Sequence, residues 1–150
     1  MNIYLFRTKG ITQVIASTLI ILFFYTASSK LLDIDEFRRQ LINQRFPDWS
    51  VGPLLWLIPI MEILVSILLV VGVTRKAGFY GSFILILLFT GYMGLVILNV
   101  FDRVPCSCGG VISSMGFKAH FLFNLFFLGL SIVGIYISKY QKKGGPVAIK

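Results

Sequence analysis

Residues 104–110 (VPCSCGG) hold the only two cysteines of the chain, Cys106 and Cys108, with one residue between them. Two thiols this close can form a disulfide with each other, and the very small ring should strain the bond. Strained, exposed disulfides are more oxidising and are typical of catalytic or regulatory sites, whereas a structural disulfide gains least from closing so short a loop. The spacing therefore favours thiol–disulfide exchange. A clamp for a soft metal ion and an inert pair, either two packed free thiols or an inert disulfide, remain as alternatives.

His120 is the only histidine and follows Cys108 by twelve residues. A histidine in this place can stabilise a thiolate or shuttle a proton for the cysteine pair. It can also serve as a third ligand for Cu(I) or Zn(II). The simpler alternative is an interfacial histidine that is hydrogen-bonded to backbone or to a lipid headgroup. Asn124 follows four residues later and should share its helix face, where a polar side chain more often joins two helices than takes part in chemistry.

Glu62 lies in the middle of a long apolar segment, three residues after Pro59. A carboxylate at membrane depth is expensive and is a functional candidate by default, so it must be paired or protonated. Lys30 is one candidate partner, because it ends the first apolar segment on the same side. Together the two side chains would form either a structural ion pair or a proton path to a redox site.

The elements that must position these residues are strongly apolar. Of the 150 residues, 57% are hydrophobic and 13% are charged, against about 45–50% and about 25% in soluble proteins. Four segments, at about 11–29, 53–73, 79–100 and 118–138, are close to the ~20 residues that cross a bilayer. Backbone groups in lipid must be paired internally, so each segment should be a helix. We therefore predict an all-α fold, an up-down bundle of four transmembrane helices in a single integral membrane domain over residues 1–150.

Two details complete the predicted scaffold. The first segment is longer than the apolar part of a cleaved signal peptide, and no small-x-small site follows it, so we expect a retained helix. Residues 34–45 predict a short amphipathic helix that connects the first two spans and lies in the outer interface of the membrane. Its apolar residues recur at helical spacing, at Ile34, Phe37 and Leu41. Asp33 or Asp35 would cap the start of this helix, and Pro47 should end it.

The net charge of +8 indicates topology rather than nucleic-acid binding, because the basic residues flank the apolar segments. The N-terminus, residues 74–78 and the C-terminal tail hold eight of the fourteen Lys and Arg and no acidic residue. The positive-inside rule then places both termini in the cytoplasm and the cysteine loop outside. The outer compartment is oxidising, which suits thiol–disulfide exchange. We therefore expect a multi-pass protein of the bacterial inner membrane.

Several of these residues also resemble a known group. Residues 24–33 (FYTASSKLLD), followed by Phe37, resemble the first helix of DoxX-like membrane proteins, and the Pro59-x-x-Glu62 step fits that group. The cysteine segment, followed by residues 118–120 (KAH) and by Asn124, resembles the MauE branch, the methylamine utilisation protein E family.

The resemblance implies a four-helix inner-membrane protein with redox work outside the cytoplasm. Relatives of the MauE type are linked to disulfide formation or maturation of methylamine dehydrogenase, whose small subunit is rich in disulfides. Relatives of the DoxX type are linked to thiosulfate:quinone oxidoreduction. A quinone between the helices is compatible with this sequence, although no motif requires one.

Our leading hypothesis is a thiol–disulfide oxidoreductase of the membrane. Cys106 and Cys108 would cycle between dithiol and disulfide with an extracytoplasmic redox or secreted partner, while His120 stabilises the thiolate. Electrons would pass to a quinone or to another redox protein. The first alternative is a non-catalytic subunit that anchors or stabilises a larger membrane complex through the cysteine loop. The second is a metal-handling protein whose ligands are Cys106, Cys108 and His120.

Overall fold

The structure is a computed structural model and describes residues 2–44, 47–98 and 117–143. These residues form five α-helices and no strand: α1 (Asn2–Leu32), α2 (Ile34–Ile42), α3 (Asp48–Val70), α4 (Arg75–Ile97) and α5 (Phe117–Lys143). Four of them, α1, α3, α4 and α5, contain segments of 23, 22, 21 and 23 residues that are long and apolar enough to cross a membrane. The prediction of an all-α bundle with four spans is therefore confirmed.

The helices extend beyond most of the predicted spans, because hydropathy omits the polar turns at helix ends. Helix α3 already begins at Asp48, five residues before the predicted start, since Pro47 precedes it in an extended conformation. It passes through Pro53 and Pro59 and ends at Val70, three residues before the predicted end.

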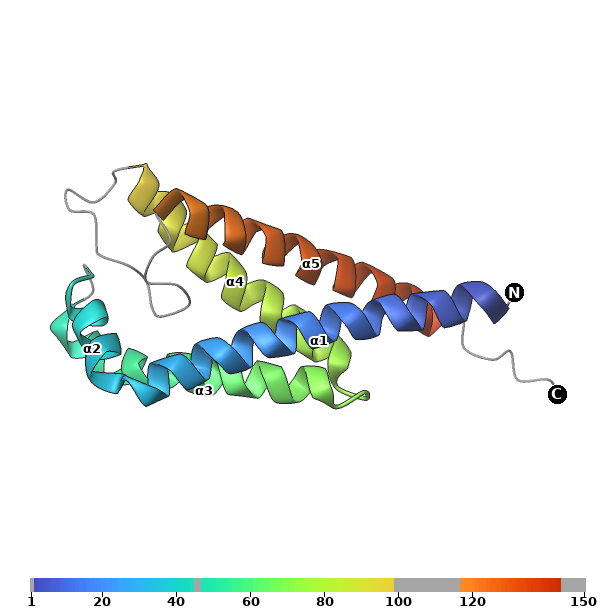
Figure 1. Ribbon diagram of the computed structural model, residues 1–150, viewed down its shortest axis with the longest axis horizontal. Helices are drawn as coiled ribbons and strands as arrows, with labels where there is room; N and C mark the ends of the chain where they lie inside the picture. The colour runs from blue at the N-terminus through green and yellow to red at the C-terminus, as the bar shows by residue number, and fades with distance from the viewer. Residues whose placement is uncertain (1, 45–46, 99–116, 144–150) are drawn as a thin grey trace.

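The four long helices run alternately up and down, with α1 packed along α3 and α4 along α5 (Figure 1). We name one end of the bundle the α2 end. This end contains α2, the last turns of α1 and α4, and the first turns of α3 and α5. At the opposite end, the turn end, the α3–α4 turn lies with the start of α1 and the end of α5. The two helix ends that bracket the cysteine segment, Ile97 and Phe117, therefore lie at the α2 end.

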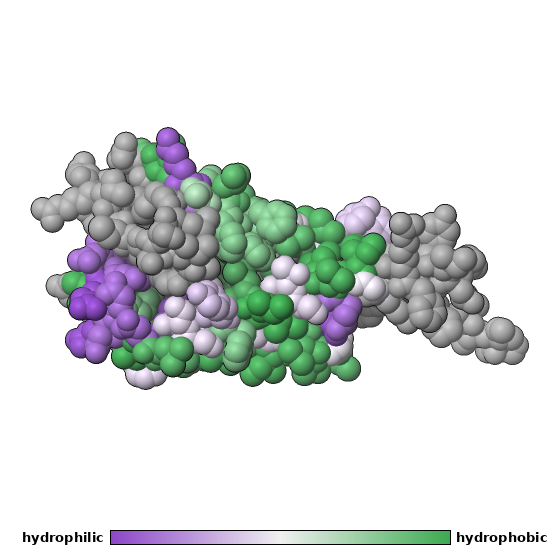
Figure 2. Space-filling model, viewed as in Figure 1, coloured by the Kyte–Doolittle hydropathy of each residue, from purple (hydrophilic) through white to green (hydrophobic). Residues whose placement is uncertain are grey.

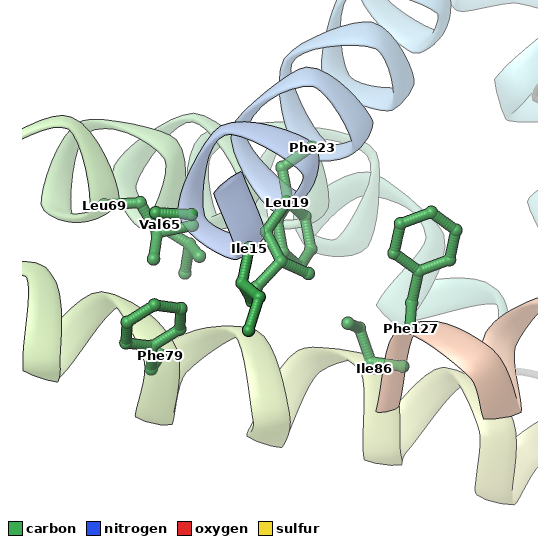
Figure 3. Packing of buried hydrophobic residues seen from close by; sticks show 9 residues of the cluster. Ile15, Leu19, Phe23, Val65, Leu69, Phe79, Ile86 and Phe127 are labelled. Carbon is green, nitrogen blue, oxygen red and sulfur yellow. The ribbon is translucent and has the colours of Figure 1, made fainter. Parts of the chain in front are cut away.

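The centre of the bundle is packed by side chains from all four long helices (Figure 3). The labelled core residues are Ile15, Leu19, Phe23, Val65, Leu69, Phe79, Ile86 and Phe127. Phe79 is fully buried and lies against Gly134 of α5, where an added Cβ atom would stand 2.5 Å from its ring. Lipid chains are as apolar as this core, so its stability comes from close packing rather than from exclusion of water.

Outside this core, exposed apolar side chains cover the middle of the bundle in the view of Figure 2, and hydrophilic residues gather over α2. Five buried hydroxyl groups are hydrogen-bonded within their own helices, to backbone carbonyls three or four residues earlier. These groups belong to Thr26, Ser66, Ser82, Thr90 and Ser131. Burying these hydroxyl groups therefore costs little free energy.

Helix α2 begins as the sequence predicts. The carboxylate of Asp33 accepts a hydrogen bond of 3.1 Å from the backbone N–H of Glu36, which is an N-cap. Phe37 and Leu41 are buried and pack against α3 around Val51. The apolar face of α2 is thus occupied by the bundle itself.

Candidate functional site

A buried ion pair joins α1 to α3 near the α2 end. Lys30, in the last turn of α1, donates a hydrogen bond of 2.7 Å from Nζ to Oε1 of Glu62 in α3. The two residues are only 8% and 2% exposed. The pairing that the sequence suggested is present, and it explains how two charges are kept in an apolar bundle: each neutralises the other at contact distance.

Two aromatic rings enclose the ammonium group of Lys30. The ring of Phe37, from α2, has its centroid 5.8 Å from Nζ, and the ring of Phe89, from α4, has its centroid 6.0 Å away. Both distances fall within the range of a cation–π attraction. Four helices therefore contribute to the surroundings of this one charge, which makes the pair a central junction of the α2 end.

The carboxylate of Glu62 has unused bonding capacity. Its Oε1 is bonded to Lys30, whereas Oε2 has no full hydrogen bond among the described residues, since the nearby Thr26 hydroxyl donates to the Phe23 carbonyl. A buried acceptor without a partner is unfavourable, more so when it is charged. The pair can therefore hold α1 and α3 together and still accept one further donor at Oε2.

His120 lies in the first turn of α5 and is half-buried. Its ring centroid is 6.4 Å from that of Phe123, at a tilt of 40°. His120 in the first turn of α5 and Lys30 in the last turn of α1 both lie at the α2 end. The only histidine and the buried ion pair thus belong to the same end of the bundle.

Asn124 joins two helices. Its side-chain amide donates a weak hydrogen bond of 3.7 Å to the sulfur of Met93 on α4. This contact agrees with the expectation that a polar side chain at this place connects helices.

The cysteine pair itself, Cys106 and Cys108, lies outside the described residues. The redox and metal hypotheses for these two residues therefore stay predictions. Of the three proposed metal ligands only His120 is described, and the described ranges contain no group of three His, Cys, Asp or Glu side chains that would hold a metal ion.

The sequence does not predict that Phe89 lies beside the ammonium group of Lys30. This phenylalanine is one of fourteen in the chain, and no local pattern distinguishes it from those that face lipid. Phe37 was expected on the apolar face of α2, but its place beside Lys30 became clear only from the packing of α2 over α1 and α3.

Comparison with known proteins gives a family. The family model for methylamine utilisation protein MauE matches residues 8–137, which is most of the chain. No curated protein and no solved structure matches. The chain therefore belongs to the MauE family, and its four long apolar helices make it a multi-pass membrane protein.

Proposed function

We propose that this member of the MauE family acts in methylamine utilisation as a membrane protein of thiol–disulfide exchange, with Cys106 and Cys108 as its redox pair. One observation carries the proposal. The cysteine segment is bracketed by the ends of α4 and α5 at the α2 end of the bundle, where the only histidine and the buried Lys30–Glu62 pair also lie.

The proposed reaction transfers a disulfide to a partner protein. A thiolate of the partner attacks the Cys106–Cys108 disulfide and forms a mixed disulfide, and one cysteine leaves as a thiolate. A second partner thiolate then releases the partner in its oxidised form, and the protein is left as a dithiol. Two electrons and two protons have moved from the partner to the protein. A quinone or another redox protein must remove them to restore the disulfide.

In this scheme His120 stabilises the cysteine thiolate or carries its proton. The partner faces the outer side of the inner membrane, and both termini of the chain lie in the cytoplasm. The family resemblance suggests the disulfide-rich small subunit of methylamine dehydrogenase as a substrate of this kind. The Lys30–Glu62 pair fixes the helices at the end where the reaction takes place.

The first test counts the thiols that are accessible from outside intact cells. A maleimide that cannot cross the bilayer is applied to the full chain with and without prior reduction. Labelling only after reduction supports an outward disulfide. The matched pair of variants is C106S/C108S and S107A, of which only the first should abolish labelling and disulfide formation in the partner.

Two results would favour the other hypotheses. If C106S/C108S leaves disulfide formation unchanged but the protein still purifies with a larger complex, the non-catalytic subunit is the better explanation. If the purified protein holds Cu(I) or Zn(II) in an amount that falls with C106S/C108S and with H120A, metal handling is the better explanation.

A further inference from the structure

The turn end of the bundle carries a concentrated positive charge. Seven basic residues lie in helix turns at this end: Arg7 and Lys9 in α1, Arg75 and Lys76 in α4, and Lys139, Lys142 and Lys143 in α5. The helices α1, α4 and α5 contain no acidic residue over their whole length. The charge at this end is therefore not neutralised by carboxylates of these three helices.

The register of α4 and α5 brings some of these residues to one level. Gly134 of α5 packs against Phe79 of α4, and the two helices are antiparallel. Lys139 follows Gly134 by five residues, and Arg75 precedes Phe79 by four. At about 1.5 Å per residue, both lie about 6–8 Å beyond the contact toward the turn end. Lys139 is thus level with Arg75 and Lys76.

Arg75 is held in place by the end of the neighbouring helix. Its Nε donates a hydrogen bond of 3.1 Å to the backbone carbonyl of Leu69 in the last turn of α3. A cation at this position is also favoured by the partial negative charge of the helix C-terminus. The bond uses one N–H of the guanidinium group and leaves its two terminal amino groups for another acceptor. Lys76 and Lys139 are exposed at the same level of the bundle.

The surface next to these basic side chains is apolar and aromatic. Tyr136 and Tyr140 are exposed on α5, with ring centroids 4.7 Å apart and a hydroxyl–hydroxyl hydrogen bond of 3.1 Å. Val73, in the α3–α4 turn, is 95% exposed. Tyrosines typically lie where hydrocarbon meets headgroups. A lipid satisfies both parts of this surface, whereas a nucleic acid or an acidic peptide would satisfy only the charges.

We propose that Arg75, Lys76 and Lys139 form a binding surface for the phosphate headgroup of an anionic phospholipid, whose acyl chains lie against the apolar side chains below. The assignment rests on charge complementarity and on the change from basic to apolar surface. It is independent of the cysteine chemistry.

The test uses the full chain in nanodiscs of phosphatidylcholine with increasing phosphatidylglycerol. Native mass spectrometry counts the phosphatidylglycerol retained and gives its affinity. Each basic residue near an anionic headgroup contributes about fivefold in affinity, so K76Q/K139Q should weaken binding about 25-fold. The control R38Q/K118Q removes two exposed charges from the α2 end and should weaken binding less than about twofold.

Three results would overturn the proposal. The first is a wild-type protein with no preference for phosphatidylglycerol over phosphatidylcholine. The second is an equal loss of affinity in K76Q/K139Q and in the control. The third is displacement of the lipid by inorganic phosphate beyond the effect of chloride at equal ionic strength, which would assign the surface to a soluble anion instead.

Discussion

Breaking the buried ion pair from either side should strongly destabilise the bundle. At the observed distance of 2.7 Å the attraction amounts to about 6 kcal/mol at an effective dielectric constant of about 20. Most of this attraction offsets the cost of burying the two charges. A single replacement leaves the other charge buried without a partner, and the expected loss is about 3–5 kcal/mol in the free energy of unfolding.

The two single variants should lose different amounts of free energy of unfolding. K30M leaves the Glu62 carboxylate, which is 2% exposed, with neither of its oxygens paired among the described residues, so its cost should lie near the upper value. E62L leaves an ammonium group in the last turn of α1, where the flexible lysine stem can bring it toward the polar α2 end. Its cost should lie near the lower value. The double variant K30M/E62L removes both charges and should return to within about 1 kcal/mol of the wild type.

The assay is a denaturant titration in mixed micelles, followed by helical circular dichroism and by tryptophan fluorescence. Both tryptophans, Trp49 and Trp56, belong to α3, the helix that carries Glu62. The four proteins form a double-mutant cycle whose interaction term gives the coupling of the two side chains. Single variants that each lose less than about 1 kcal/mol, or losses that simply add in the double variant, would refute the argument that the pair is buried and mutually neutralising.

Three further predictions concern packing and capping. G134A should lower the free energy of unfolding by about 1–3 kcal/mol, because the new Cβ would stand 2.5 Å from a buried ring, whereas G129A meets no atom within 4 Å and should not destabilise in the same titration. D33A should lower the free energy of unfolding by about 1 kcal/mol, because it removes the cap of α2. The control D35A should lower it by only a few tenths of a kcal/mol, and equal losses in the two variants would contradict the capping role. N124L should cost less than about 1 kcal/mol, since it removes one weak interhelical bond, and thiol labelling should be unchanged.

The sequence predicts those features that depend on local composition. Apolar length gives the four spans, and an aspartate before an apolar-periodic run limits the cap of α2 to Asp33 or Asp35, of which the structure uses Asp33. The sequence also offers Lys30 as a candidate partner of Glu62, because a carboxylate in lipid must be paired or protonated and Lys30 ends the neighbouring span on the same side; the structure contains this pair. In each case the physical requirement can be stated without knowing which helix faces which.

Features that depend on how helices face one another are not predicted. Two glycines of α4 illustrate this: a Cβ added at Gly91 would meet no atom within 4 Å, whereas one added at Gly94 would make an ordinary contact of 3.6 Å with Phe121. Among the glycines that the structure describes, the closest approach is at Gly134, opposite Phe79. Its place follows from the register of α5 on α4, which is fixed by packing over the whole bundle. The enclosure of Lys30 by Phe89 escapes prediction for the same reason.

Helix α2 is better understood as a cover for the ion pair than as a surface element alone. Helix α1 ends two residues after Lys30, and the next residue, Asp33, caps the start of α2. Helix α2 then folds back so that the ring of Phe37 lies over the ammonium group of Lys30. The ring contributes a cation–π attraction and also keeps water from the charges, which strengthens their mutual attraction. Unfolding of α2 would therefore weaken the pair, and loss of the pair would remove a contact that holds α2. We expect the junction of α1, α2 and α3 to open as one cooperative unit.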